Sequence, residues 1–331
     1  MTYDRVSGLD KDISRMVFGC DWIFADEARL PASFEILDQV AGIGCNAFDT
    51  AHGYCGGDSE RALGRWMEAR GNREQMVILT KGAHHNGDRK RVTPYDIESD
   101  LHDSLARLRT DYVDLYLLHR DDVSVEVGPI VEVLNKYYEK GIIRAFGGSN
   151  WTHRRLEMAN EYACRHNLQP FMASSPNFGL AEQVENPWGP GCVGLNGPDL
   201  QDARAWYTRH PDVRIFAYSS LARGFFSGRI HSGMTPEEGR TMLDGAAFKA
   251  YFHPVNQKRL ARAEELALRK GLSVAQIAVA YVMNHPLRIF ALQAPRTLAE
   301  MQQNNAAIHL ALTTEEMAWL NLEDEGASDA K

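Results

Sequence analysis

Residues 48–66 read FDTAHGYCGGDSERALGRW, and the fold of the whole chain is best approached from this stretch. Its start belongs to a short apolar run, 45–49, typical of a β-strand, and the carboxylate Asp49 stands at the end of that run. A loop with three glycines carries Tyr54, and Ser59 is placed to open a helix. Polar groups between a strand's carboxyl end and a helix are how enzymes built from βα units present their chemistry. Taken alone, the stretch could also be an ordinary strand–turn–helix.

The rest of the chain repeats this alternation of apolar runs and amphipathic segments. The predicted strands are 16–20, 45–49, 76–81, 113–119, 143–149, 171–175, 213–219 and 289–294. The predicted helices are 31–43, 59–70, 94–109, 128–140, 152–166, 199–210, 256–285, 297–307 and 313–322. Eight strands, each followed by helix without a break in composition, predict one closed (β/α)8 TIM barrel over residues 1–331. A doubly wound open sheet shares the same alternation and remains the alternative fold.

Three further segments bear on this prediction. Residues 183–198 are rich in glycine and proline and too long for a plain connection, which indicates a structured loop after the sixth strand. Residues 222–254 follow the seventh strand and carry several glycines, as a lid would. Residues 42–47, GIGCNA, match a dinucleotide-binding fingerprint but end a helical pattern and enter a strand, the reverse of the required order. We therefore discard that motif.

Composition limits the classes of function. The chain has 36 Lys and Arg against 44 Asp and Glu, a net charge of -8, which argues against nucleic acid or an anionic membrane as partner. No apolar run approaches the length of a membrane span, and residues 1–10 lack the layout of a signal peptide. Five cysteines without CxxC spacing indicate reduced thiols in a cytoplasmic protein and no metal site. The sequence does not determine the oligomeric state, so a homo-oligomer is one possibility.

Four polar residues are expected to meet at one face of the barrel. Asp49, Lys81 and His119 end the second, third and fourth predicted strands, and Tyr54 follows Asp49 closely. An ammonium beside a tyrosine favours the phenolate and lowers the tyrosine pKa, while an aspartate holds the lysine in place. A histidine across the pocket can orient a carbonyl group. This set suits protonation of a carbonyl oxygen while a hydride arrives at the carbon.

With this set of four residues, the chain resembles the aldo-keto reductase family, and the resemblance extends along nearly its whole length. The matching blocks, in the order and at the approximate spacing of the family, are FDTAHGYCGGDSERALGRW, ILTKG, DYVDLYLLHR, FGGSNW, FAYSSLARGFFSG and the more divergent ALQAPRTLAEMQQNN. The resemblance implies an (α/β)8 barrel that binds a nicotinamide cofactor without the fingerprint discarded above. It implies a catalytic tetrad of Asp49, Tyr54, Lys81 and His119. In that tetrad Tyr54 is the general acid, Lys81 modulates its pKa, Asp49 pairs with Lys81 and His119 orients the substrate.

The resemblance also implies the cofactor contacts. Ser149 and Asn150 match the pair that binds the nicotinamide carboxamide, and Tyr218 matches the residue on which the ring stacks. The pyrophosphate segment is matched by Ser219, Leu221, Arg223, Gly224 and Gly228, and the adenosine side by Arg296, Glu300 and Asn304. NADPH is the expected cofactor, with NADH as the alternative, because a guanidinium such as Arg296 suits a phosphate monoester.

Four residues depart from the family pattern. Ser175 replaces a longer glutamine that also contacts the carboxamide, and Ser220 replaces a proline. Ala294 replaces the glycine that opens the adenosine block, and Glu300 stands where glutamine or arginine is common. A carboxylate facing a 2′-phosphate would repel it.

The expected substrate is a polar carbonyl compound, a sugar or a sugar-derived aldehyde, which places the protein in carbohydrate metabolism. Trp22, Trp151, Tyr54 and His119 are predicted to bind it, and the other expected pocket residues are His153, Asn177, Phe178 and Trp188. Aromatic faces with interspersed hydrogen-bonding groups suit a ring with an apolar face and a hydroxylated edge. The alternative is that these tryptophans merely pack the mouth of the barrel.

Two other functions remain to be weighed against a carbonyl reductase. Relatives that serve as β-subunits of potassium channels keep the fold and the cofactor but act chiefly through a partner. No partner-binding motif here supports that function, and turnover of a simple aldehyde would distinguish the two. An isomerase or lyase on the same barrel could use His119 as a base, but the cofactor blocks would then have no purpose.

Overall fold

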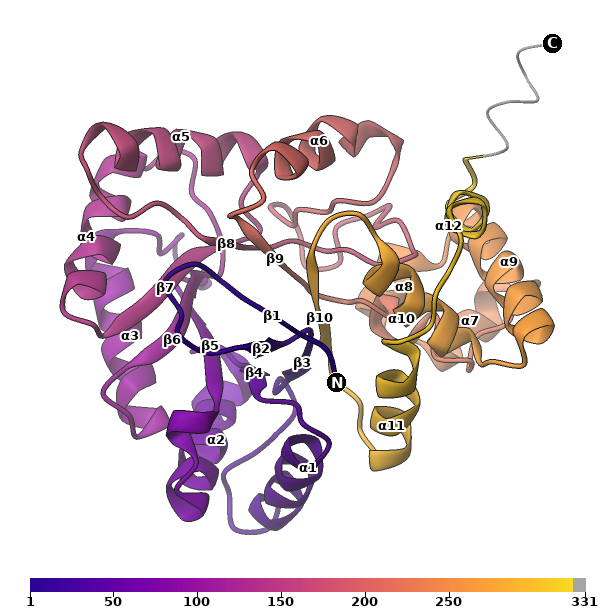
Figure 1. The fold of residues 1–331 in the computed structure, drawn as a ribbon, viewed down its shortest axis with the longest axis horizontal. Helices are drawn as coiled ribbons and strands as arrows, with labels where there is room; N and C mark the ends of the chain where they lie inside the picture. Colours follow the sequence, from indigo (N-terminus) through magenta and orange to yellow (C-terminus); the bar gives the residue numbers. More distant parts are fainter. Residues whose placement is uncertain (324–331) are drawn as a thin grey trace.

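A closed barrel of parallel strands forms the centre of the computed structural model, which describes residues 1–323 (Figure 1). Hydrogen bonds connect the strands in the order β10-β3-β4-β5-β6-β7-β8-β9, and β10 pairs with β3 to close the ring. The strands are β3 (Met16–Gly19), β4 (Ala47–Asp49), β5 (Val77–Gly82), β6 (Val113–Leu118), β7 (Ile143–Ser149), β8 (Ala173–Ser175), β9 (Arg214–Ala217) and β10 (Ile289–Gln293). The predicted (β/α)8 barrel is confirmed, and the open sheet is excluded.

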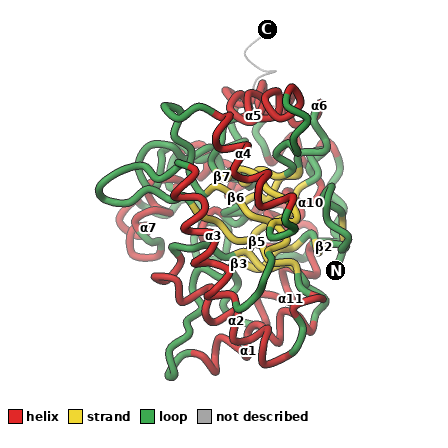
Figure 2. Tube along the Cα trace, turned by 90° about the vertical axis from the view of Figure 1, so that its left-hand side faces the viewer, coloured by secondary structure: helices red, strands yellow, loops and turns green. Residues whose placement is uncertain are grey.

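Two layers of apolar side chains hold the barrel together. One cluster fills its interior, with Val17, Leu79, Leu115 and Phe290 among its members, and a larger one lies between the strands and the helices. Because both faces of each strand are covered, the strands appear in the sequence as continuous apolar runs. Figure 2 shows the strands at the centre with helices around them.

The start of the chain closes the amino end of the barrel. The short strands β1 (Tyr3–Asp4) and β2 (Ile13–Ser14) pair antiparallel. Val6, Leu9 and Ile13 are buried in the interior cluster together with residues at the amino ends of the barrel strands. This end is therefore plugged, which leaves the carboxyl ends of the strands for chemistry.

The helices begin and end at recognisable signals. Thr93 caps α3 with Pro94 in the first turn, and Thr313 forms a capping box with Glu316 in α12. The helices are α1 (Leu30–Gly42), α2 (Asp58–Arg70), α3 (Pro94–Leu108), α4 (Val127–Glu139), α5 (His153–Arg165), α6 (Gln201–Arg209), α7 (Pro236–Met242), α8 (Gly245–Tyr251), α9 (Pro254–Lys270), α10 (Val274–Asn284), α11 (Leu298–Ala307) and α12 (Thr314–Leu320).

Two local predictions were wrong. The segment 256–285 is two helices, because Gly271 ends α9 in the left-handed conformation (φ 66°) and Ser273 caps α10. Ser59 does not cap α2. Its buried hydroxyl donates instead to the Cys20 carbonyl at 2.7 Å, so it joins the ends of β3 and α2.

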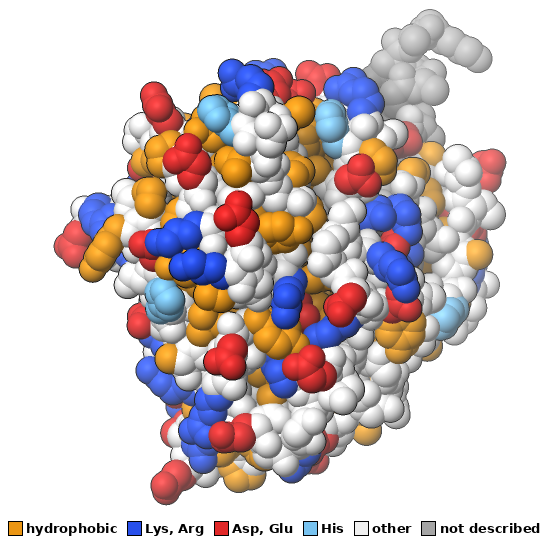
Figure 3. Space-filling view, turned by 60° about the vertical axis from the view of Figure 1, so that its left-hand side comes forward, with side chains coloured by type: hydrophobic (Ala, Val, Ile, Leu, Met, Phe, Trp, Pro, Cys, Tyr) orange, Lys and Arg blue, Asp and Glu red, His pale blue; other side chains and the backbone are white. Residues whose placement is uncertain are grey.

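Charges of both signs cover the surface. On the face shown in Figure 3, Lys and Arg side chains are interspersed with Asp and Glu rather than gathered in one field. Within residues 1–323 no single helix is long and apolar enough to cross a membrane. The α9–α10 pair meets the length and composition criteria together, but it is bent by 100°.

Candidate active site

Asp49, Tyr54 and Lys81 meet at the carboxyl ends of β4 and β5. Asp49 is the last residue of β4, Lys81 lies in β5, and Tyr54 opens the short 3-10 helix η1 (Tyr54–Gly57). The backbone holds this corner together, because the His52 N–H donates to the Lys81 carbonyl at 2.8 Å. The expected convergence of these residues therefore follows from the parallel register of the strands.

Lys81 is the centre of the cluster. Its buried Nζ donates to Asp49 Oδ1 at 2.5 Å, to the Thr50 carbonyl at 3.0 Å and to the Tyr54 hydroxyl at 3.3 Å. An ammonium has three donors, and all three are used within the chain. Lys81 is thus fixed in one position with one of its protons directed at the tyrosine oxygen.

Burial and charge act in opposite directions on these groups. Burial raises the pKa of Tyr54 to about 12, although the Lys81 ammonium acts to lower it. Burial likewise raises the pKa of Asp49 to about 6 against the same ammonium. Burial opposes the charge on Lys81, but Asp49 and Tyr54 outweigh it and raise the Lys81 pKa. The expected net lowering of the tyrosine pKa is therefore not found, and Tyr54 is a protonated donor at neutral pH.

His119 faces the tyrosine from the end of β6. Its ring lies edge-on to Tyr54, with ring centroids 5.6 Å apart, and its backbone N–H donates to the Gly82 carbonyl at 2.8 Å. Burial, with the Lys81 charge adding to it, lowers the pKa of His119 well below its usual value. Its buried Nδ1 has no hydrogen-bond partner within the described chain. The imidazole is therefore neutral at pH 7 and free to bond a ligand oxygen.

Three polar residues lie at the carboxyl ends of β7 and β8 beside the tetrad: Ser149 and Ser175 end these strands, and Asn150 follows β7. The Ser149 hydroxyl donates to the Ser175 carbonyl at 3.0 Å. The Asn150 side chain donates to the His119 carbonyl and accepts from the Tyr218 hydroxyl at 2.8 Å. The Ser175 hydroxyl is buried without a partner in the part of the chain that the structure describes. An unused buried hydroxyl at this point fits a carboxamide, even though serine is shorter than the usual glutamine.

The residues implied for the ring and the pyrophosphate lie on the connection after β9. Tyr218 is half-buried, and Ser219, Arg223 and Gly224 have left-handed backbone. The exposed Arg223 forms an ion pair with Asp244 at 2.9 Å. The other residues implied here are Leu221, which is partly buried, and Gly228, which is exposed with φ 88°. The predicted insertion 222–254 contains α7 and α8, and Tyr251 of α8 accepts a hydrogen bond from Asn177 beside β8.

The adenosine side is the start of α11. Arg296 lies over the Trp22 ring at 5.1 Å, and it forms no ion pair with any residue in the range 1–323. The Glu300 carboxylate accepts from the Arg296 backbone N–H at 2.8 Å, so it is tied to the helix start. Asn304 is buried in α11. A free guanidinium fits a 2′-phosphate, and the binding of Glu300 to backbone reduces the repulsion expected from its charge.

The predicted pocket residues divide into two groups. Trp22 is half-buried and Trp188 is exposed, with its ring 6.2 Å from that of Tyr218, so both are available to a ligand. Trp151, which was predicted to bind the substrate, does not line the site. Its ring is fully buried, donates to the Arg120 carbonyl at 3.2 Å and packs on Phe171, because the chain after β7 turns it into the helix layer.

The remaining three expected pocket residues also face elsewhere. The His153 ring contacts Trp206, with ring centroids 6.4 Å apart, and so lies between α5 and α6. Asn177 is buried against Tyr251, and Phe178 is buried against His285, with ring centroids 4.8 Å apart. The wall of the site is therefore less aromatic than expected.

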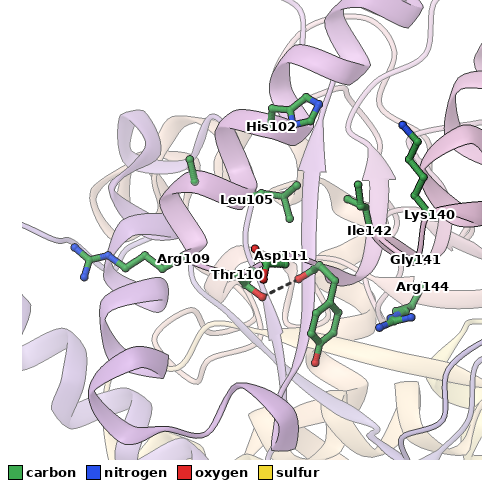
Figure 4. Close-up of a pocket in the computed structure, with 11 residues that line it drawn as sticks. His102, Leu105, Arg109, Thr110, Asp111, Lys140, Gly141, Ile142 and Arg144 are labelled. Atoms are coloured by element: carbon green, nitrogen blue, oxygen red, sulfur yellow. Dashed lines mark hydrogen bonds between the residues drawn. The ribbon is translucent and has the colours of Figure 1, made fainter.

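One surface hollow of the molecule lies away from this site. A cavity of about 710 Å³ lies at the other end of β6, and its lining includes His102 of α3, Arg109 after α3, Lys140 after α4 and Arg144 of β7 (Figure 4). Tyr112, which precedes β6, lines this hollow, whereas His119 follows β6. The hollow therefore belongs to the amino face of the barrel.

The sequence reasoning missed several neighbours of the tetrad. Thr50 supplies the third acceptor of Lys81, and its hydroxyl bonds Ser59 at 2.7 Å. The His84 ring lies edge-on to His119, with ring centroids 4.7 Å apart. Arg120 is buried directly after His119. A signal for the last two was present, since both stand within three residues of a tetrad member at a strand's carboxyl end.

A family model with the description Aldo/keto reductase family matches residues 15–322. The chain belongs to that family. Among curated relatives it is 27% identical over 350 residues to Protein tas of Escherichia coli (strain K12), covering 96% of each chain. It is 28% identical over 312 residues to Aryl-alcohol dehydrogenase [NADP(+)] of Phanerodontia chrysosporium, covering 88% of this chain and 75% of that one.

Solved structures agree on the fold. An aldo-keto reductase from Klebsiella pneumoniae in complex with NADPH superposes with a TM-score of 0.72 at 23% identity, covering 98% of this chain and 95% of the other. The thermostable aldo-keto reductase Tm1743, bound to the inhibitor epalrestat, gives 0.74 at 23% identity, covering 97% of this chain and 99% of the other. At this identity the likeness supports the (β/α)8 barrel and no finer property.

Proposed function

We propose that this chain is an NADPH-dependent oxidoreductase that reduces an aldehyde or ketone to an alcohol, with Tyr54 as the general acid. The observation that carries the proposal is the bond from Lys81 to the Tyr54 hydroxyl within a buried pair with Asp49. When bound, the reduced nicotinamide supplies the hydride. Ser149, Asn150, Ser175 and Tyr218 would hold its ring, and Arg296 and Asn304 the adenosine side.

Each residue of the tetrad has a separate task in this proposal. Tyr54 gives its hydroxyl proton to the carbonyl oxygen, and the Lys81 ammonium stabilises the phenolate that remains. Asp49 keeps Lys81 charged and in place. His119 is neutral and can donate a ring N–H to the same oxygen, which positions the carbonyl beside Tyr54.

The proposed substrate is a polar carbonyl compound, such as a sugar or a sugar-derived aldehyde. The support is that the site keeps two accessible aromatic rings, Trp22 and Trp188, together with the buried polar atoms His119 Nδ1 and Ser175 Oγ, which have no partner within residues 1–323. The name of one curated relative refers to aryl alcohols, so aromatic aldehydes belong in the same comparison.

A cofactor titration and a substrate panel test the proposal together. Quenching of tryptophan fluorescence is expected to give a Kd for NADPH at least 10-fold lower than for NADH. Arg296→Gln should remove most of that difference, since one charge-assisted contact contributes about 1.5–3 kcal/mol. Arg165→Gln, an exposed arginine of α5, is the control. Equal binding of both nucleotides would contradict the NADPH assignment, and the absence of any aldehyde reduction would contradict the enzyme.

A further inference from the structure

Arg120 is a buried cation without a carboxylate partner among residues 1–323. It follows β6 and His119 directly, and only 7% of its surface is exposed. Its guanidinium donates to the Gly191 carbonyl and the Cys192 sulfur, both at 3.3 Å, and it forms no ion pair within residues 1–323. The two acids that follow it are already engaged, Asp121 with Arg155 and Asp122 with Lys90. Two long bonds to neutral acceptors leave most of its donors unused.

This guanidinium lies at the rim of the proposed active site. The loop that it contacts reaches the site, because the Val193 N–H donates to the Asn150 side chain at 3.2 Å and Trp188 lies against Tyr218. On the other side His84 lies edge-on to His119. The positive charge of Arg120 contributes to lowering the pKa values of His119, His84 and His85, in agreement with this position.

His84 and His85 lie next to His119 and Arg120 in the fold but do not add donors for an anion, because the His84 Nδ1–H is already given to the His85 carbonyl at 2.8 Å and the other nitrogen of that neutral ring can only accept. Burial lowers the pKa of His84 and of His85, so both are neutral at pH 7. The donors for an anion are therefore those of the Arg120 guanidinium, whose planar fork suits a carboxylate or a phosphate.

We infer that Arg120 receives an anionic group of the substrate, so that the substrate is a carbonyl compound carrying a carboxylate or a phosphate. The inference rests on the proposed reductase function and narrows its substrate class. An incoming anion completes the coordination of a buried charge for which residues 1–323 supply no carboxylate. It also fixes the distance between the anionic group and the carbonyl at Tyr54, which favours one chain length over others.

Matched pairs of aldehydes test this in the presence of NADPH. 4-Formylbenzoate is compared with its methyl ester, and glyceraldehyde 3-phosphate with glyceraldehyde. We expect kcat/KM to favour the anion at least 10-fold in one pair, which identifies whether a carboxylate or a phosphate is preferred. Arg120→Gln should lower that ratio at least 10-fold, Arg120→Lys should lower it less, and the distant Arg165→Gln should not change it. An unchanged ratio in a folded Arg120→Gln protein would overturn the inference.

A binding measurement separates this inference from the reductase proposal. p-Toluate and p-toluamide have no reducible carbonyl, and calorimetric titration of the chain, with and without NADPH, needs no turnover. We expect the carboxylate to bind at least 10-fold more tightly than the amide, and Arg120→Gln to remove the difference. Equal binding of both compounds, together with no preference for glyceraldehyde 3-phosphate, would refute the anion site even if neutral aldehydes are reduced. Failure to reduce every aldehyde would refute the reductase while the titration still decides the anion site.

Discussion

At the scale of single residues, the buried pair of Lys81 and Asp49 dominates the site. The two side chains are 3% and 4% exposed and 2.5 Å apart, so neither has water to replace its partner. Removing one member of such a pair leaves an unpaired charge in a medium of low polarity, which costs more than the pair itself contributes. The pair is therefore the point where catalysis and stability depend on the same contact.

Lys81→Met is expected to lower the free energy of unfolding by about 3–5 kcal/mol, because Asp49 is left buried and unpaired. The double variant Asp49→Asn with Lys81→Met should recover most of that loss, since no charge then remains. Urea unfolding of the two proteins measures the difference. A single variant as stable as the parent would show that the pair is more solvated than the structure indicates. Reductase activity is expected to be lost in both.

A second prediction at the scale of single residues concerns His285 and the pH dependence of the free energy of unfolding. His285 follows α10, accepts the Leu287 N–H on Nδ1 at 3.2 Å, and burial lowers its pKa from 6.5 to about 4. The unfolded chain therefore takes up a proton near pH 6.5 that the folded chain refuses, so stability is lost as the pH falls below 6.5.

His285→Asn cannot titrate, so its stability should lack this part of the pH dependence. Relative to the variant, the parent should lose about 2 kcal/mol of unfolding free energy between pH 7 and pH 5. Urea unfolding at the two pH values gives both numbers for each protein. Parallel losses in parent and variant would show that another group carries the effect.

At the scale of elements, α2 and α3 pack so closely that a side chain at one position of α2 would collide with α3. Gly64 of α2 lies against the carboxyl end of α3, and a Cβ there would be 2.5 Å from the Arg107 carbonyl oxygen. In Gly42, at the end of α1, a Cβ would meet nothing within 4 Å. Both glycines are in helices, but only Gly64 is enclosed by a neighbouring helix. Gly42 therefore serves as the control.

Gly64→Ala is expected to destabilise the protein by about 1–3 kcal/mol, because backbone has to move to admit the methyl group. Gly42→Ala should be neutral or slightly stabilising, since alanine favours helix. Thermal unfolding of both variants tests this directly. If Gly64→Ala unfolds at the temperature of Gly42→Ala or above, then α2 and α3 are not in the close contact described.

The element scale also shows where sequence reasoning was limited. The strands were predictable because nearly all of their residues are buried and so form apolar runs, as in residues 289–293. The break at Gly271 also carried a signal in the sequence that the prediction did not use, namely a glycine followed by Ser273 with Gln276 three residues later, which is the pattern of a helix end and a new capping box. The burial of Trp151, by contrast, could not be predicted, since it depends on the direction the chain takes after β7.

At the scale of the whole molecule, the topology brings distant residues to one place. The order of strands puts β4, β5 and β6 side by side, which is enough to predict that Asp49, Lys81 and His119 meet. The pKa of Tyr54 was predicted with the wrong sign, because burial by the surrounding barrel outweighs the adjacent ammonium. Arg120 is held at the rim of the site by contacts with Gly191 and Cys192 of the loop 183–198. These contacts could not be derived from the sequence, because they depend on the path of that loop.

The central claim is that Tyr54 delivers the proton to the carbonyl oxygen, and Tyr54→Phe tests it most directly. The variant loses the hydroxyl but keeps Tyr218, Ser149 and Asn150. We predict that steady-state reduction of an aldehyde substrate of the parent falls at least 1,000-fold in kcat, in line with the loss of a proton donor, while the Kd for NADPH from fluorescence titration changes less than 3-fold. Retained turnover in a folded, cofactor-binding Tyr54→Phe protein would contradict the account.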